Sequence, residues 1–246
     1  QMVPAADIPL YEEISPEICR VNLSAWKKAG LPADWLFQMF LETATVSQNG
    51  AKTFLQYLEI VEQMLSKNSA SFSIEEWLAY RSVYLKYGIH AVHHSESYRA
   101  AEQPAYRIIH KKFLRLLPIL QEAAKLPKND IKIIAIDGRA ASGKTTLADN
   151  LSRILSADVI HMDDFFLPPA LRTEERLTEA GGNIHYERFL EEVIPLLKKS
   201  QPFSYRIFDC NQMDYNGSQT ISPTPFRIVE GAYSCHPLFG NYADLT

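Results

Sequence analysis

The pattern of apolar and polar positions changes near the middle of the chain. Up to residue 126, apolar residues recur at spacings of three and four, as they do between residues 54 and 65, so that they share one face of a helix. A Ser-Pro pair at 15–16 and a Ser-x-x-Glu box at 73–76 are typical of helix starts. This pattern predicts an all-α helical domain over residues 1–126, with no convincing strand and with helices that include residues 15–30, 104–117 and 118–126.

The pattern after the segment LPKND at 126–130 is different. The run IKIIAI at 131–136 is continuous, apolar and rich in β-branched residues, which is typical of a strand buried on both faces of a parallel sheet. Helical patterns alternate with three further strand-like runs, DVIHM, FSYRIFD and FRIVEG. This alternation predicts an α/β domain over residues 127–246.

A glycine-rich loop joins the first of these strands to a helical segment. Its small residues allow backbone N–H groups to surround phosphate oxygens, and the start of the next helix adds a positive dipole. Lys144 can reach the β- and γ-phosphates, and the Thr145 hydroxyl can bind Mg²⁺. We therefore expect nucleotide binding in a P-loop NTPase-type parallel sheet with flanking helices. The matching residues, with the threonine that follows, are Gly138, Arg139, Ala140, Ala141, Ser142, Gly143, Lys144, Thr145 and Thr146.

Acidic residues stand at the ends of two other predicted strands. Asp163 and Asp164 follow the run DVIHM, and Glu230 ends the run FRIVE. The carboxyl ends of parallel strands face the crevice where α/β domains bind ligands, so these acids are candidates for a general base and for metal binding. The alternatives are a helix-capping or loop aspartate at 163 and 164, and a strand-end acid paired with a lysine at 230.

Five motifs in order resemble a known family. AIDGRAASGKTTLA, HMDDFF, GGNIHYERF, YRIFDC and IVEGAYS are similar to the uridine kinase branch of the uridine kinase/phosphoribulokinase group of P-loop kinases. The resemblance covers residues from about 131 to 246, and we recognise no family for residues 1–125. It implies a kinase that uses ATP and Mg²⁺ to transfer the γ-phosphoryl group to a hydroxyl of a small metabolite such as a nucleoside.

The same resemblance implies roles for single residues. Asp163 occupies the first acid of the family's Asp-Ser-Phe-Tyr element, which implies a general base next to Mg²⁺, whereas Asp164 stands where the family has serine. Lys144 is implied in catalysis, and the metal is implied at Thr145, Asp163 and Glu230. The residues implied on the acceptor side are Phe166, His185, Tyr205, Arg206 and Asp209.

Two departures from the family pattern bear on the substrate. His185 stands where nucleoside-phosphorylating members carry an aspartate that holds ribose hydroxyls, and a neutral imidazole lacks the charge-assisted strength of a carboxylate; the plainer interpretation is a helix-start residue. The family continues past the last residues here with a lid helix carrying arginines, so we expect the domain to lack its lid portion. Arg139, Arg172 and Arg176 are the nearest arginines, the last two in a loop that either closes over the site or stays solvated.

Two alternatives to a nucleoside kinase therefore remain open. One is a kinase for a non-nucleoside acceptor, such as a sugar phosphate or a vitamin precursor. The other is a nucleotide-dependent switch in which the helical half is a partner-binding module.

Composition narrows the cellular context. The 246 residues carry a net charge of −4, which argues against nucleic acid or anionic membrane as a partner, and no apolar run approaches a membrane span. Three scattered cysteines favour a reducing cytoplasm, and the N-terminus has no secretory signal pattern. The oligomeric state is left open. Two clusters are interpreted as polar or solvated surface. They are the histidines at 90, 93 and 94, which are not assigned to a metal site, and the basic residues at 107, 111, 112 and 115, which are not assigned to nucleic-acid binding.

Overall fold

The chain forms two compact units, each described by itself. The computed structural model describes residues 8–46, 50–67 and 72–246. The first unit combines the residues up to 40 with residues 107–246, and the second comprises residues 41–106. This division does not coincide with the boundary at 126–127 that the sequence suggested.

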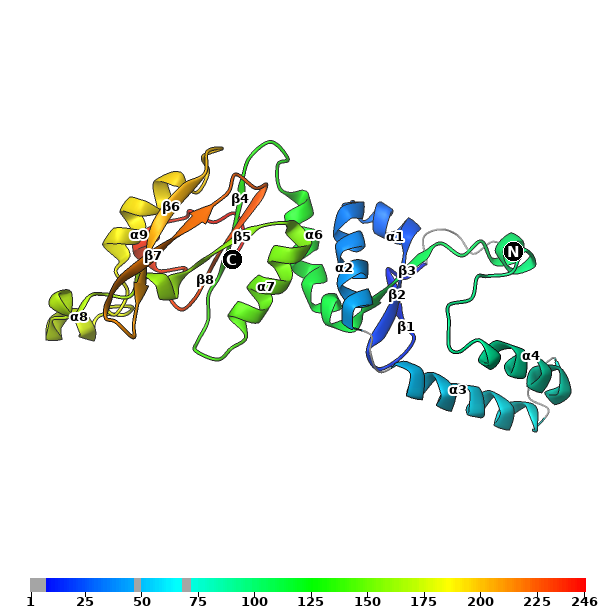
Figure 1. Ribbon diagram of the computed structural model, residues 1–246. Coiled ribbons are helices and arrows are strands. Elements are labelled where there is room, and N and C mark those ends of the chain that lie inside the picture. Colours follow the sequence, from blue (N-terminus) through cyan, green and yellow to red (C-terminus); the bar gives the residue numbers. More distant parts are fainter. Residues whose placement is uncertain (1–7, 47–49, 68–71) are drawn as a thin grey trace. The chain divides into compact units, whose positions relative to one another are not determined.

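A three-stranded parallel sheet lies in the first unit (Figure 1). The central strand β8 (Phe226–Glu230) pairs with β4 (Lys132–Ile136) on one side and with β5 (Asp158–His161) on the other. Every residue of β4 and β8 is buried, as the continuous apolar run at 131–136 predicted. The α/β fold class, with a glycine-rich loop between the first strand of this sheet and the next helix, is therefore confirmed.

The two faces of the sheet carry separate hydrophobic clusters because successive side chains of a strand point to opposite sides. On β4, Ile134 joins the cluster that includes residues of α6 (Leu117–Lys125) and α7 (Lys144–Leu155). Its neighbour Ile133 joins the cluster that includes residues of α9 (Tyr186–Glu192). Both faces are thus covered, and the strand ends at the carboxyl edge are left for a site.

An antiparallel hairpin lies beside the turn that follows β5. Its strands are β6 (Phe203–Asp209) and β7 (Asp214–Ile221), and β6 packs against the 3₁₀ turn Met162–Phe165. The short helix α8 (Glu174–Thr178) lies in the loop before α9.

The N-terminal part departs from the all-α expectation. The strands β1 (Tyr11–Glu13), β2 (Ile18–Asn22) and β3 (Tyr106–His110) form a second sheet with β2 in the centre. The part of the chain before residue 127 is mostly helical, but the expected absence of strands from it needs correction.

The correction concerns the two segments 15–30 and 104–117, where helices were expected and strands are present. The Ser15 hydroxyl accepts the backbone N–H of Ile18 at 3.0 Å, which closes a turn, and alternate residues of β2 are then buried with the period of a strand. The helix α1 (Leu23–Lys28) begins only after Asn22. In the later segment, β3 leads into a 3₁₀ helix, Lys111–Leu116, and α6 follows as expected.

The described residues before position 41 belong to the same unit as the parallel sheet because of their packing. The helix α2 (Ala33–Val46) starts with buried aromatic and aliphatic side chains. The Trp35 ring meets the Phe226 ring of β8 edge-on at a centroid distance of 5.9 Å, and Met39 joins the same cluster as Leu151 of α7.

The second unit is built of helices. α3 (Gly50–Leu65), α4 (Ile74–Lys86) and α5 (Glu96–Glu102) lie in it, and the predicted capping box of Ser73 and Glu76 opens α4. Across the described ranges of both units, none of the helices has the length and apolar character needed to cross a membrane.

Candidate functional site

The loop between β4 and α7 folds back on itself. Gly138 (φ 156°) and Gly143 (φ 88°) adopt backbone conformations that other residues rarely take, and a Cβ on Gly138 would lie 3.0 Å from Ser142 Oγ. Lys144, the first residue of α7, donates from Nζ to the carbonyl oxygen of Arg139 at 2.9 Å. The lysine therefore spans the loop, and the positive end of α7 opens into it, an arrangement suited to phosphate.

Glu230, the last residue of β8, faces the start of α7. Its side chain is buried, and the Thr145 hydroxyl oxygen lies 3.4 Å from each of its carboxylate oxygens. A Cβ on Gly231 would lie 2.6 Å from the Cβ of Met162, so only glycine fits between the end of β8 and the turn after β5. Two of the residues at which the resemblance implied a metal, Thr145 and Glu230, are thus in contact.

His161 is a neighbour of Glu230 that the sequence analysis did not single out. It ends β5 in register with Glu230 on β8, and its Nδ1 lies 2.6 Å from Oε1 of Glu230. Its position at the end of a predicted strand, directly before the two aspartates, was the available signal. The imidazole and the Thr145 hydroxyl hold the Glu230 carboxylate between them.

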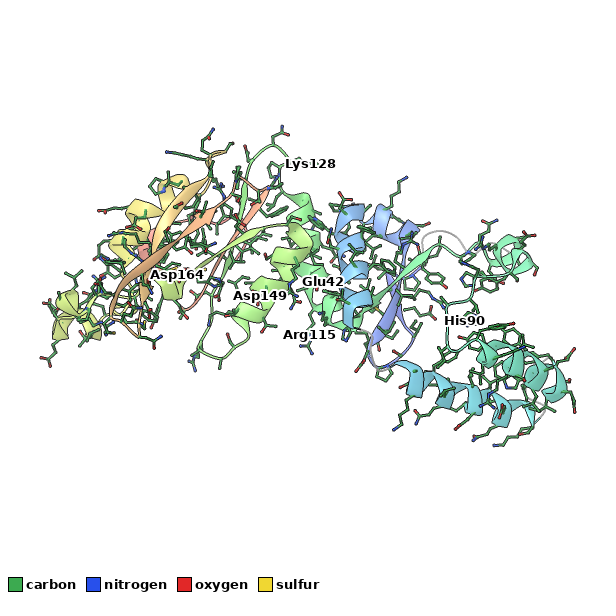
Figure 2. All side chains as sticks on the ribbon, in the orientation of Figure 1. Glu42, His90, Arg115, Lys128, Asp149 and Asp164 are labelled. Carbon is green, nitrogen blue, oxygen red and sulfur yellow. The ribbon has the colours of Figure 1, made fainter. Side chains whose placement is uncertain are left out.

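The two aspartates that follow β5 differ in environment. Asp163 is exposed on the 3₁₀ turn, whereas Asp164 is partly buried and accepts a hydrogen bond from the Tyr205 hydroxyl at 2.8 Å. Burial raises the pKa of the Asp164 carboxyl, and the hydrogen bond from Tyr205 opposes this rise. Arg188 donates to the backbone carbonyl of Asp164. Asp164, labelled in Figure 2, therefore ties the turn to β6, and Asp163 is the exposed carboxylate at the strand end.

Three residues that the resemblance placed on the acceptor side make contacts within or beside the hairpin. Tyr205 is 1 % exposed, and its hydroxyl is used by Asp164. The Arg206 Nε donates to Glu192 Oε1 at 3.1 Å, and Asp209 accepts a backbone hydrogen bond in the hairpin turn. In this structure these side chains stabilise the β6–β7 hairpin and its attachment to neighbouring elements.

The other two acceptor-side residues lie on adjoining segments. Phe166 forms an isolated β-bridge with Ile184, and the next backbone N–H, that of His185, donates to the Phe165 carbonyl at 2.6 Å. The His185 Nδ1 also accepts the backbone N–H of Arg188 at 3.4 Å, so His185 is the N-cap of α9. The helix-start interpretation is thus confirmed, and the backbone of His185 is bonded to the turn that carries Asp163.

A cavity of about 430 Å³ includes His185 in its wall. Arg176 also lines it. Its guanidinium pairs with both carboxylate oxygens of Glu187 at 2.8 and 3.0 Å, and donates to the carbonyls of Gly182 and Ile184. Arg176 therefore organises this loop. The lining residues are Leu167, Leu171, Thr173, Glu175, Arg176, Glu179, His185 and Glu187.

The donor chemistry of the site suits a hard cation. Over the described residues, no three His, Cys, Asp or Glu side chains are grouped so as to hold a metal ion. In the histidine cluster of the second unit, the His90 ring stacks on the Tyr84 ring at a centroid distance of 4.5 Å. Mg²⁺ prefers few carboxylates together with other oxygen ligands. The Thr145 hydroxyl and the Glu230 carboxylate are such ligands at the end of the phosphate loop, so the residues fit this ion.

Comparisons with known proteins give similarity only at the level of structure. No protein-family model and no curated protein matches the chain. A possible uridine kinase from Bacillus stearothermophilus has 22% identity and a TM-score of 0.48, with 55% of this chain and 78% of that chain covered. A D-glycerate 3-kinase from Cryptococcus neoformans var. grubii has 19% identity and a TM-score of 0.37, with 48% and 49% covered, so the chain spans about half of its length. Similarities of this size support no conclusion about activity.

Proposed function

We propose that the chain is an ATP-dependent kinase, a phosphotransferase with an alcohol group as acceptor. It transfers the γ-phosphoryl group to a hydroxyl of a small metabolite, and a nucleoside or related sugar is the first candidate, as in uridine kinase-like enzymes. The observation that carries the proposal is the meeting of three strand ends at one edge of a parallel sheet. The phosphate loop follows β4, Asp163 follows β5, and Glu230 ends β8.

Each part of the site has a role in this proposal. The loop amides and Lys144 hold the β- and γ-phosphates. Thr145 and Glu230, with Asp163 at the neighbouring strand end, would hold Mg²⁺, which neutralises phosphate charge when it is bound. His161 and the Thr145 hydroxyl fix the orientation of Glu230 through their contacts at 2.6 and 3.4 Å.

Asp163 acts as the general base. Its exposed carboxylate accepts the proton of the acceptor hydroxyl while the acceptor oxygen bonds to the γ-phosphorus and the bond to the leaving ADP oxygen breaks. Asp164 is less suited to this step because Tyr205 occupies its carboxylate.

The cavity beside His185 is the proposed acceptor pocket. Its wall is connected to the Asp163 turn, since the His185 N–H donates to the Phe165 carbonyl and the Leu167 N–H donates to the Asn183 carbonyl at 2.8 Å. His185 would contact the acceptor from the wall of this cavity, and Phe166 would support that wall through its β-bridge with Ile184. Tyr205, Arg206 and Asp209 would act by holding the hairpin that flanks the turn.

A nucleotide-dependent switch is the second candidate. The observation that favours it lies in α4 of the second unit and its C-cap, Tyr87. Tyr80, Val83 and Tyr87 are 56%, 64% and 75% exposed at spacings of three and four. An apolar stripe of this kind suits a partner protein. In that case ATP would bind and no acceptor would be phosphorylated.

Phosphoryl transfer from labelled ATP, with Mg²⁺ and a panel of nucleosides, sugars and vitamin precursors, tests the proposal. Transfer to one acceptor, lost in Lys144→Ala and in Asp163→Asn, would support the kinase and name its substrate. ATP binding without transfer to any member would favour the switch.

A further inference from the structure

The segment that follows β8, residues 231–236, is bonded to Asp137 through two of its backbone N–H groups. This aspartate is the residue between β4 and the phosphate loop. Its Oδ1 accepts the backbone N–H of Tyr233 at 3.1 Å, and its Oδ2 accepts that of Cys235 at 2.9 Å. Oδ1 also accepts the N–H of Gly138, the first residue of the phosphate loop, at 2.6 Å. One carboxylate therefore joins the loop to a segment nearly a hundred residues away in the sequence.

The far end of the same segment contacts the turn before α9. The His236 Nε2 lies 3.0 Å from the carbonyl oxygen of Ala180, and the His236 ring stacks on Tyr186 with a centroid distance of 5.5 Å. A Cβ on Gly181 would lie 3.1 Å from the Tyr233 ring and 3.2 Å from the His236 ring. The segment thus packs closely on the turn that leads to His185.

The backbone conformation of the segment has to be stabilised by contacts with residues outside it. Tyr233 has φ +65°, a left-handed conformation that is costly for a residue with a side chain and persists where the surroundings impose it. Backbone N–H groups that donate to a carboxylate form charge-assisted bonds, which are stronger than bonds between neutral groups. The two hydrogen bonds from Tyr233 and Cys235 to Asp137 stabilise the segment in this way.

The charge of Asp137 points to the same role. A carboxylate next to a phosphate loop repels the phosphates bound there, so phosphate binding itself gives no reason for an acid at this position. The hydrogen bonds to the segment give that reason, because a neutral side chain of the same size offers only one acceptor oxygen.

We propose that Asp137 is a positioning residue that keeps residues 231–236 in register with the phosphate loop. By doing so it fixes Glu230, which directly precedes the segment, against Thr145, and it fixes the turn at 180–182 on the acceptor side. The part that concerns Glu230 rests on the proposed function, in which Glu230 serves Mg²⁺. The part that concerns the turn does not depend on it.

Two measurements on Asp137→Ala and Asp137→Asn test the proposal, with Asp149→Ala, an exposed aspartate on α7, as the matched control (Figure 2). The first is the affinity for a fluorescent ADP analogue with and without Mg²⁺. In Asp137→Ala the affinity without Mg²⁺ should be equal or higher, because a negative charge is removed. The gain in affinity on adding Mg²⁺ should fall about tenfold, which corresponds to 1.4 kcal/mol. Asp137→Asn should be intermediate.

The second measurement is amide hydrogen exchange of the ligand-free protein. Exchange should become faster in Asp137→Ala at residues 231–236 and at residues 180–186. The amides of β4 and α7 in this variant should exchange as in the wild type. Asp149→Ala should keep the wild-type pattern throughout.

Two outcomes would overturn the proposal. One is an equal loss of ADP-analogue affinity with and without Mg²⁺, and the other is unchanged exchange at 180–186 in both Asp137 variants. A wild-type protein that binds no nucleotide would instead contradict the proposed function, and the exchange measurement would still decide the role of Asp137.

Discussion

The Thr145 hydroxyl oxygen lies 3.4 Å from both carboxylate oxygens of Glu230, although the two residues are 85 positions apart in the chain. The contact exists because β4, which leads into the phosphate loop, pairs directly with β8, with Ile136 opposite Glu230. The phosphate-binding and acidic parts of the site are therefore built on adjacent, fully buried strands, which gives the pair a rigid support.

Thr145→Val should weaken the Mg²⁺-dependent part of nucleotide binding. Valine keeps the approximate volume and removes the oxygen that faces Glu230, so the gain in ADP-analogue affinity on adding Mg²⁺ should fall about tenfold, equivalent to 1.4 kcal/mol. Thr146→Val at the next position is the matched control and should retain the gain. Equal effects of the two substitutions would show that the contact with Glu230 does not serve the metal.

Asp163→Asn should lower the rate of phosphoryl transfer by about 10²–10⁴-fold, the usual contribution of a general base. Nucleotide affinity measured without Mg²⁺ should stay close to the wild-type value because the phosphate loop is unchanged. Asp164→Asn is the control: its amide oxygen still accepts the Tyr205 hydroxyl, so most of the activity should remain. Steady-state kinetics of both variants check this, and the opposite ranking would transfer the role of base to Asp164.

Asp164 should also make stability depend on pH. Burial raises the pKa of its carboxyl, so the folded chain binds this proton more tightly than the unfolded chain, and the contribution to stability falls as pH rises from the unfolded pKa through the folded pKa. Asp164→Asn removes this loss. The free energy of unfolding of the variant minus that of the wild type should grow over this window, and then stay level up to about pH 7. Urea denaturation at several pH values measures the difference, and a difference that shrinks with rising pH would contradict the account.

The charge of the cavity beside His185 should select among acceptors. Glu175, Glu179 and Glu187 line it, and the guanidinium of Arg176 is used by Glu187 and by backbone carbonyls. Neutral or amine-bearing hydroxyl compounds should therefore be preferred over carboxylates and phosphates of similar size.

Glu175→Lys tests this selectivity against Glu174→Lys, which makes the same change of charge on α8 outside the lining of the cavity. Only Glu175→Lys should shift the relative binding of D-glucosamine and D-glucuronate toward the acid, by roughly threefold to tenfold, and increasing salt should weaken the shift. Calorimetric titration of the two sugars measures it. Identical shifts in both variants would indicate a general effect of net charge.

Local sequence signals predicted the strand before the glycine-rich loop and the helix after it, β4 and α7. The glycine positions, Lys144 and Thr145 belong to one continuous motif, and Glu230 ends an apolar run, so each could be read from its immediate surroundings. Parallel pairing brings such strand ends to one edge of a sheet, and Thr145 and Glu230 are in contact there, which the motifs alone did not predict.

The features that the sequence did not predict depend on long-range packing. The strand β2 replaced an expected helix because the Ser15 side chain closes a turn and because its alternate residues are buried in a sheet. The division of the chain at residue 40 reflects the packing of Trp35 on Phe226, which are 191 positions apart by number. The bond from Tyr205 to Asp164 and the contact of His161 with Glu230 likewise join separate segments, and no motif records them.

The most direct test of the central claim is to follow ATP by ³¹P NMR in the presence of the protein, Mg²⁺ and a mixture of neutral hydroxyl acceptors. The proposed kinase predicts a new phosphomonoester resonance that grows in step with ADP and is absent for Asp163→Asn. The growth of inorganic phosphate alone, or an ATP spectrum that stays unchanged while nucleotide binding is demonstrated, would contradict phosphoryl transfer to an alcohol and support the nucleotide-dependent switch.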